Sequence, residues 1–323
     1  MAKKRRIKKK VKRLITLVIV IIVLVIGGIV GTNIYNDYKY KQTFEYKLLE
    51  KEYKIDEVNI LLNKLKDNEI EDILNRDYIN NLSNIVNEKY FLYKNLDRYI
   101  TYYKKDPGVS LSNIISLVNT NRDGEYYGDT KNADTSKDIL VLVNKYYFLD
   151  EDYEPSNLTN ISSTYAFEGN ILREDVFEHY KAMYNEAKAH DINLVINSSY
   201  RTFKDQENVW TARKNAYGTK SADSYAARPG FSEHQTGLAL DINEYPTSES
   251  DFENTDSFKW LQEHAHEYGF ILRYPKSTDD KPYEDITGYS YESWHYRYVG
   301  KDIATKIKNE NITFDEYYAF YLE

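Results

Sequence analysis

Residues 232–241 read SEHQTGLALD, and residues 292–295 read ESWH. If the apolar run that follows Gly237 forms a β-strand, alternate side chains point to opposite sides, so Asp241 and Leu240 face different ways. Asp241 then stands on a buried strand, where a carboxylate is costly unless it is paired or bound to a metal. The first stretch therefore indicates either a metal site or a buried ion pair.

The chain offers metal ligands, but none of them is a cysteine. Its 323 residues contain no Cys, which excludes disulfides, Cys-ligated zinc, iron–sulfur clusters and thiol nucleophiles. His234, Asp241 and His295 can supply the three protein ligands of a catalytic zinc and leave its fourth position open. Glu292 is the candidate carboxylate that takes a proton from the activated water. By themselves these four residues are a weak signal. The other four histidines are not expected to bind metal: His179, His190, His264 and His266.

The full sequence pattern around His234, Asp241, Glu292 and His295 is a more specific signal than these four residues alone. S-x-H-x-x-G-x-A-x-D at 232–241, followed by E-x-W-H at 292–295, resembles the VanY-like D-alanyl-D-alanine carboxypeptidases. These are zinc peptidases of bacterial peptidoglycan, related in fold to the D-Ala-D-Ala dipeptidases and to the hedgehog signalling domain. The resemblance covers residues 137–300. Further matching segments are NK at 144–145, Leu149, YEP at 153–155, SYRT at 199–202, Gln206 and GFILRYP at 269–275.

Four further residues are expected to contact the substrate. The resemblance implies that Arg201, Gln206 and Ser232 hold it, just as it implies that the three ligands above bind Zn2+ and that Glu292 is the general base. An exopeptidase must recognise a terminal carboxylate, and a guanidinium fork fits one with two charge-assisted hydrogen bonds, which agrees with Arg201. Without the resemblance, Arg201 could equally form a surface salt bridge. Trp294 either packs in the core or forms a wall of the pocket.

The N-terminal part of the chain predicts a membrane anchor. Residues 14–31 read LITLVIVIIVLVIGGIVG, and this uncharged run would span ~27 Å as a helix, close to the ~30 Å hydrocarbon core of a bilayer. We assign the anchor to residues 14–34. Residues 1–13 carry nine Lys and Arg residues and no acid, so this tail should stay cytoplasmic and the rest of the chain should be extracytoplasmic in a bacterial cell membrane. The alternative is a cleaved signal peptide, whose apolar core is usually shorter.

The charge of the chain argues against nucleic acid as a partner. The formal net charge is −8, and once the basic tail is set aside the remaining residues carry a net charge of −17. A nucleic-acid-binding protein needs a basic face instead. The expected partners are the peptidoglycan stem peptide and, through residues 14–34, the lipid bilayer.

The pattern of apolar residues predicts an α+β protein. Helices are expected over 173–189, 203–216 and 258–268, and short strands over 139–143, 194–196, 238–242, 270–274 and 295–299. The resemblance implies a hedgehog/D-Ala-D-Ala-peptidase-like zinc domain, preceded by the membrane helix and a small helical region. The expected parts are a basic tail (1–13), an anchor (14–34), a helical extracytoplasmic region (35–130), a zinc carboxypeptidase domain (137–300) and a C-terminal helical segment (301–323).

The expected function is that of a membrane-anchored zinc D,D-carboxypeptidase, which hydrolyses the C-terminal D-amino acid from peptidoglycan stem peptides. An L,D-carboxypeptidase that acts on tetrapeptide stems would have the same motif. A zinc-containing wall-binding domain without catalysis is a further alternative, although the presence of Glu292 argues against it. A serine carboxypeptidase is disfavoured because the chain contains no S-x-x-K. The helical region alone would also fit a membrane-anchored spacer.

Overall fold

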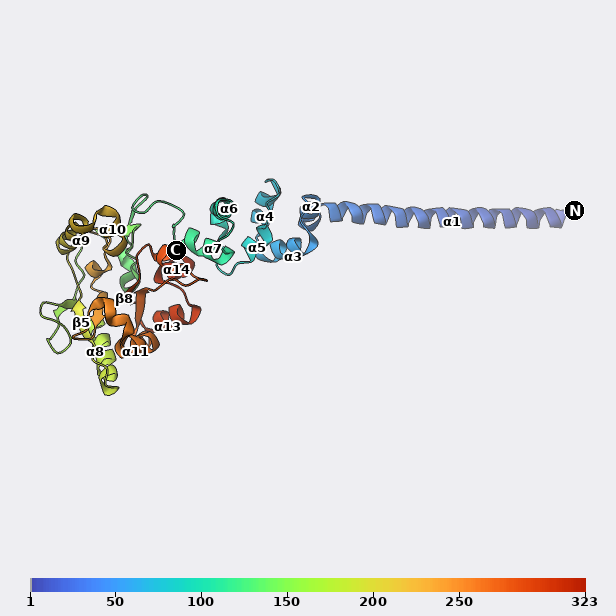
Figure 1. Cartoon of the computed structure of the whole chain (residues 1–323). Coiled ribbons are helices and arrows are strands. Elements are labelled where there is room, and N and C mark those ends of the chain that lie inside the picture. The colour runs from blue at the N-terminus through green and yellow to red at the C-terminus, as the bar shows by residue number, and fades with distance from the viewer. Residues whose placement is uncertain (1) are drawn as a thin grey trace. The chain divides into compact units, whose positions relative to one another are not determined.

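The computed structural model describes residues 2–323 and divides the chain into two compact units, Met1–Tyr93 and Lys94–Glu323. Met1, part of the basic tail expected at 1–13, lies outside the described residues. The first unit begins with the long helix α1 (Ala2–Lys41), visible as one continuous rod in Figure 1. Within α1, the segment Arg6–Lys41 has a window of mean hydropathy 3.2 and is long and apolar enough to cross a membrane.

Short helices make up the rest of the first unit: α2 (Phe44–Glu50), α3 (Ile55–Lys64), α4 (Asp67–Leu74) and α5 (Leu82–Asn87). Helix α3 buries Val58 and Leu61, and Leu48 of α2 and Ile73 of α4 are fully buried. These apolar residues recur at helical spacing, so each helix presents one stripe to a small common core.

Helices α6 (Leu96–Lys105) and α7 (Leu111–Asn119) belong to the second unit. The break at Tyr93 therefore falls inside the range 35–130, which the sequence presents as a single helical region. The physical reason lies in the polar contacts of α7, where the Ser116 hydroxyl donates to Glu316 over 2.6 Å. Amphipathic stripes show that a helix packs, but they do not show on which partner it packs.

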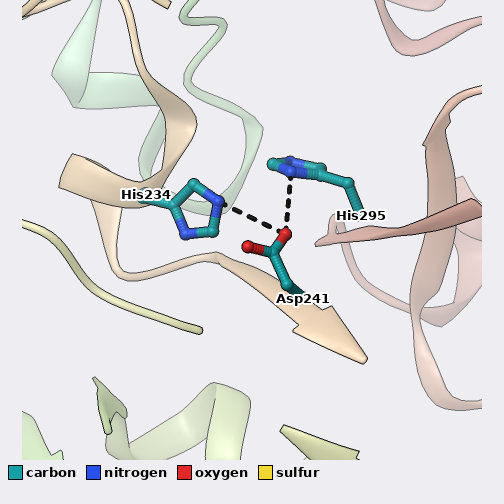
Figure 2. A group of neighbouring side chains, drawn as sticks. All are labelled: His234, Asp241 and His295. Carbon is teal, nitrogen blue, oxygen red and sulfur yellow. Dashed lines mark ion pairs between the residues drawn. The ribbon is translucent and has the colours of Figure 1, made fainter. Parts of the chain in front are cut away.

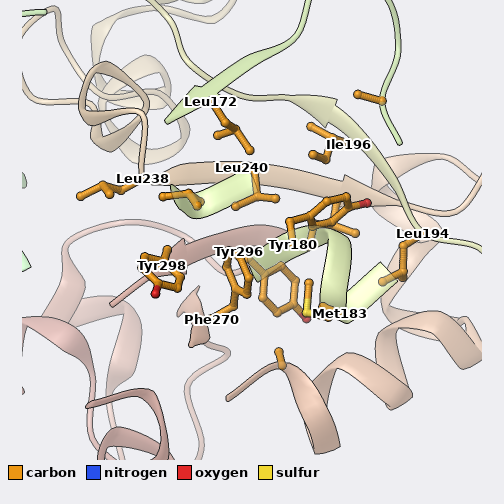
Figure 3. Close-up of a cluster of buried hydrophobic side chains, with 14 of the residues drawn as sticks. Leu172, Tyr180, Met183, Leu194, Ile196, Leu238, Leu240, Phe270, Tyr296 and Tyr298 are labelled. Atoms are coloured by element: carbon orange, nitrogen blue, oxygen red, sulfur yellow. The ribbon is translucent and has the colours of Figure 1, made fainter. Parts of the chain in front are cut away.

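A four-stranded antiparallel sheet forms the centre of the second unit. Its order is β5 (Val195–Ser198), β6 (Ala239–Asn243), β8 (Glu292–Tyr298) and β7 (Phe270–Tyr274). One face is apolar and packs on α8 (Glu174–Ala189) and α11 (Asp256–His264). Figure 3 shows this core, which contains Leu240, Phe270 and Tyr296 from the sheet, Leu238 just before β6, and Tyr180 and Met183 from α8.

The opposite face of the sheet is charged and also buried. Asp241, Arg273, His295 and Arg297 alternate with the core residues along β6, β7 and β8, and none of them is more than 7 % exposed. The predicted alternation in the strand at 238–242 is therefore confirmed: Leu240 faces the core, and Asp241 faces the other way.

The remaining elements surround this sheet. They are β1 (Lys131–Asn132), β2 (Tyr147–Phe148), β3 (Leu158–Asn160), β4 (Ile171–Arg173), α9 (Phe203–Tyr217), α10 (Thr219–Tyr225), α12 (Tyr283–Thr287), α13 (Lys301–Glu310) and α14 (Phe314–Tyr321). The mixed α+β architecture is confirmed, as are the helices expected over 173–189 and 203–216 and the strand over 270–274.

The prediction of a strand over 139–143 was wrong. A 3₁₀ turn (Thr135–Leu140) occupies the beginning of this segment, and irregular chain follows it. The guanidinium of Arg297 donates to the carbonyl oxygens of Ile139 and Val141 over 3.0 and 2.8 Å. The side chains of Val141, Leu142 and Val143 are buried, but the Arg297 side chain satisfies these backbone acceptors in place of a neighbouring strand.

Gly269 marks the end of the helix expected over 258–268. Helix α11 continues into a 3₁₀ turn (Ala265–Tyr268), and Gly269 follows with φ +92°. A Cβ at this position would lie 2.7 Å from the ring of Tyr298 and 3.1 Å from the backbone of Gly300. Glycine is therefore required here both by the backbone conformation and by the close approach of β8.

We expect Gly269→Ala to lower the free energy of unfolding by more than Gly169→Ala. Gly169 also has a positive φ (+88°), but no atom lies within 4 Å of its added Cβ. The control should therefore lose only the ~1–2 kcal/mol of left-handed backbone strain, whereas Gly269→Ala adds a steric clash of ~1–3 kcal/mol. Denaturant unfolding of both purified variants measures the difference. Equal losses would show that the contact with Tyr298 has no role.

Candidate active site

The pairing of two central strands places Asp241 beside His295. These residues lie directly opposite each other in the register of β6 and β8. His234 comes from a 3₁₀ turn (Glu233–Thr236) just before β6. Figure 2 shows how both imidazoles approach one carboxylate oxygen: His234 Nε2 lies 3.5 Å and His295 Nδ1 lies 3.2 Å from Asp241 Oδ1.

Gly237 links the turn that carries His234 to strand β6. Its φ is +67°, in the left-handed region. A Cβ here would also lie 3.1 Å from the side chain of Arg173 and 3.3 Å from that of Leu158. The glycine of the motif therefore allows the chain to turn sharply between the first histidine and the strand of the aspartate.

The second nitrogen of each imidazole has its own fixed neighbour. His234 Nδ1 lies 2.6 Å from the carbonyl oxygen of Ser199, so Nδ1 carries the proton and the lone pair of Nε2 faces the site. His295 Nε2 lies 3.6 Å from Glu233 Oε2, which leaves Nδ1 as the nitrogen that faces Asp241. Metal-binding histidines in proteins usually have a carbonyl or a carboxylate behind the ring. Here the carbonyl of Ser199 is hydrogen-bonded to His234, whereas the carboxylate of Glu233 lies at ion-pair distance from His295.

The protonation states of the three residues differ. Burial, assisted by the positive charge of Arg201, lowers the pKa of His234 to about 4. Burial also opposes the charged form of His295, but the neighbouring carboxylates of Asp241, Glu233 and Glu292 outweigh it and raise the pKa of His295 to about 9. The pKa of Asp241 is lowered by the two histidines against the effect of burial. Asp241 is thus ionised and His234 neutral, as metal ligands must be, whereas His295 must lose a proton.

Glu292 reaches the same site through an irregularity in the sheet. Tyr274 pairs with Glu292 and Leu272 with Tyr296, so β8 advances four residues where β7 advances two. This bulge brings Glu292 Oε2 to 3.6 Å from His295 Nδ1, although a regular strand would direct residues three apart to opposite faces. Burial raises the pKa of Glu292 to about 8. The carboxylate is therefore a stronger base than an exposed glutamate.

A cavity of about 760 Å³ opens onto these residues. Arg201 Nη2 lies 4.0 Å from Asp241 Oδ2, and its buried Nε has no hydrogen-bond partner. Gln206 donates to the carbonyl of Ala227 over 2.7 Å, while its Oε1 has no partner. The cavity wall includes all eight residues that the sequence singled out: Arg201, Gln206, Ser232, His234, Asp241, Glu292, Trp294 and His295.

Glu233 is a site residue that the sequence analysis missed. It is fully buried, and its Oε1 accepts hydrogen bonds from Arg273 Nε and Arg297 Nη1, each over 2.8 Å. Against the effect of burial, these two arginines lower its pKa. A charged residue inside an otherwise buried motif was the available signal, because such a carboxylate requires partners.

The site fits a divalent metal ion. His234, Asp241 and His295 each offer a ligand atom, and the three atoms lie within 4.8 Å of one another. His234 Nε2 and Asp241 Oδ1 are buried without a hydrogen-bond partner, which is costly unless another group binds them. Two imidazoles and one carboxylate are ligands typical of a catalytic zinc site.

Comparisons with known proteins identify the family of this chain. Residues 169–301 match the family model VanY: D-alanyl-D-alanine carboxypeptidase. YodJ of Bacillus subtilis is 38% identical over 210 residues, which cover 61% of this chain and 75% of YodJ. The bifunctional D-Ala-D-Ala dipeptidase and D-Ala-D-Ala carboxypeptidase VanXYC of Enterococcus gallinarum is 32% identical, with 56% of this chain and 94% of VanXYC covered.

A solved structure is similar as well. The LdcB LD-carboxypeptidase is 37% identical, with a TM-score of 0.54 and with 59% of this chain and 90% of LdcB covered. The match to the family model includes every predicted metal-binding and substrate-binding residue. The chain is therefore a peptidase and belongs to the VanY-like D-alanyl-D-alanine carboxypeptidase family.

Proposed function

We propose that this protein is a zinc D,D-carboxypeptidase that removes the C-terminal D-amino acid from peptidoglycan stem peptides. The observation that carries the proposal is the group formed by His234, Asp241 and His295, with the Glu292 carboxylate 3.6 Å from one of the imidazoles. Arg201 lies in the same cavity. The names of two relatives, VanXYC and LdcB, state carboxypeptidase activity, which supports the reaction class.

In this proposal each residue has one task. His234, Asp241 and His295 hold the zinc ion, which when bound supplies a Lewis acid and lowers the pKa of water toward ~7. Arg201 binds the terminal carboxylate of the substrate, assisted by Gln206 and Ser232, and Trp294 forms part of the wall. Glu292 accepts a proton from the attacking water and returns it to the leaving amine. Its carboxylate lies 3.6 Å from the ligand His295, so it is close enough to the metal position to exchange a proton with a water there.

The location follows from helix α1. We propose that residues 14–34 anchor the protein in the cell membrane, with the basic tail 1–13 in the cytoplasm and the peptidase outside, where its wall substrate is found. The length and apolar character of α1 support this. Residues 137–300 as the zinc carboxypeptidase domain, and the likeness of that domain to the hedgehog fold, are part of the same proposal.

An L,D-carboxypeptidase that acts on tetrapeptide stems is the second candidate. The similarity to LdcB, at 37% identity, favours it. The two activities differ in the residue that precedes the scissile bond, so the same metal ligands and base would serve either one. The choice between them rests on the substrate that the purified protein shortens.

The first test compares a stem pentapeptide with a stem tetrapeptide. We expect mass spectrometry to show a pentapeptide shortened by one residue, with turnover lost after dialysis against a chelator and restored by zinc. Shortening of the tetrapeptide alone would establish the L,D activity instead. Turnover that survives complete removal of metal would contradict a zinc enzyme of either kind.

The second test is Glu292→Gln, which keeps the shape of the side chain and removes the base. We expect kcat to fall by ~10²–10⁴-fold, the usual contribution of a general base. The zinc content should remain that of the wild type, because Glu292 is not one of the three ligands. A variant with full zinc content and near-normal turnover would show that another group takes the proton.

The third test concerns the terminal carboxylate. Loss of a charge-assisted hydrogen bond costs ~1.5–3 kcal/mol, so Arg201→Ala should lower kcat/KM by about 10- to 100-fold on a peptide with a free C-terminus. The matched control is the same peptide with a C-terminal amide, which has no carboxylate to bind. If the substitution reduces kcat/KM equally on both peptides, Arg201 does not recognise the carboxylate.

A further inference from the structure

We infer that Asp315 and Arg122 are positioning residues for the metal ligand His295, and that they act through Arg273 and Glu233. This inference rests on the zinc site proposed above. Both residues lie outside the residues 169–301 that match the family model, one before and one after that range. The parts of the second unit beyond the family match would then help to build the metal site.

Arg122, Asp315, Arg273 and Glu233 form a chain of contacts that leads to His295, and we call it the connection. Its inner part is the contact between Glu233 and His295. Glu233 Oε2 lies 3.6 Å behind His295 Nε2, on the side of the ring away from Asp241. Glu233 Oε1 is held by Arg273 and Arg297 from strands β7 and β8. Because two guanidinium groups fix one oxygen of this carboxylate, the position of the other oxygen, and with it the orientation of the imidazole, depends on them.

The outer part of the connection holds Arg273. Its Nη1 donates to Asp315 Oδ2 over 2.6 Å, while Nε of the same guanidinium donates to Glu233. Asp315 Oδ1 accepts from Asn144 Nδ2 over 2.7 Å and from Arg122 Nη2 over 3.3 Å. The planar guanidinium of Arg273 is thus a rigid link between the two carboxylates, a role that a lysine could not fill.

Because all four side chains of the connection are buried, the loss of any one charge should disturb the other three. The side chains of Arg122, Glu233, Arg273 and Asp315 are each at most 1 % exposed. Removing one charge from such a set leaves its partner buried and uncompensated, so the remaining groups must shift toward new partners. If Asp315 loses its charge, Arg122 loses its carboxylate partner, and Arg273 keeps only Glu233, which it shares with Arg297.

The chain fixes both outer residues firmly. Asp315 lies in the first turn of α14, where Thr313 and Glu316 cap the helix by accepting from each other's backbone N–H. Arg122 follows α7 and donates to the carbonyl oxygens of Ile286 and Thr287 over 2.7 and 2.9 Å. The outer end of the connection is therefore anchored to α7, α12 and α14 together.

The experiment compares Asp315→Asn with Glu316→Gln in the full chain. Both variants neutralise a buried carboxylate on α14. Glu316, however, accepts from Ser116, Lys281 and the backbone of Thr313, none of which contacts Glu233. We expect Asp315→Asn to weaken zinc binding by ~10- to 100-fold, as is usual when the support of a metal-binding histidine is lost. Glu316→Gln should destabilise the protein without changing its zinc affinity.

Zinc affinity is measured by competition with a chelating dye, and stability by thermal unfolding of the metal-free protein. Glu233→Gln should weaken zinc binding in the same way. The double variant Asp315→Asn/Glu233→Gln should bind zinc no more weakly than the weaker-binding of the two single variants, because Asp315 acts through Glu233. If the Asp315→Asn variant does not fold, Arg122→Gln replaces it, because Arg122 holds Asp315. This variant should also bind zinc more weakly than the wild type.

Several results would overturn the inference. They are an unchanged zinc affinity in the folded Asp315 or Arg122 variant, an equal loss of affinity in Glu316→Gln, and additive losses in the double variant. A wild-type chain that binds no zinc would instead overturn the proposed function, and this inference with it. The two failures are distinguishable, because only the second is seen in the unmodified protein.

Discussion

The charged face of the central sheet constrains the rest of the second unit. Asp241, Arg273, His295 and Arg297 lie on this face and are all buried. Each buried ion costs several kcal/mol in free energy unless an opposite charge, a hydrogen bond or a metal compensates it. Glu233 compensates the two arginines and Asp315 supports one of them, while Asp241 lies between two imidazoles. The positions of α14 and of the segment 139–143 follow from that requirement.

The parts of the site that could be predicted from the sequence are those that depend on local patterns. The alternation in 238–242 assigned Leu240 to the core and Asp241 to the opposite face, and the structure has both there. The sequence motif predicted Arg201 and Glu292 as site residues, and both line the cavity together with the three candidate ligands. A strand of period two needs no information from distant residues, and a motif carries its own spacing.

The remaining parts depend on contacts between residues far apart in the chain. Glu233 and Arg273 are 40 positions apart, and Arg273 and Asp315 are 42 apart. No periodicity links such residues, so neither the partners of the Glu233 carboxylate nor the boundary at Tyr93 could be predicted. The segment 139–143 has the composition of a strand, but Arg297 satisfies its carbonyl oxygens, and composition alone does not reveal a side-chain donor.

Strand β8 carries Glu292, His295 and Arg297 within six residues, and its bulge sets the first of them beside the second. Insertions and deletions should therefore have very different effects in this strand and in its flanking loops. An insertion in a surface loop changes only the length of a connection. One residue added after Trp294 would turn the imidazole toward the apolar core and Tyr296 toward the charged face of the sheet. Lengthening or shortening of the chain in descendants of this protein should accumulate in the loops and be absent from these few positions.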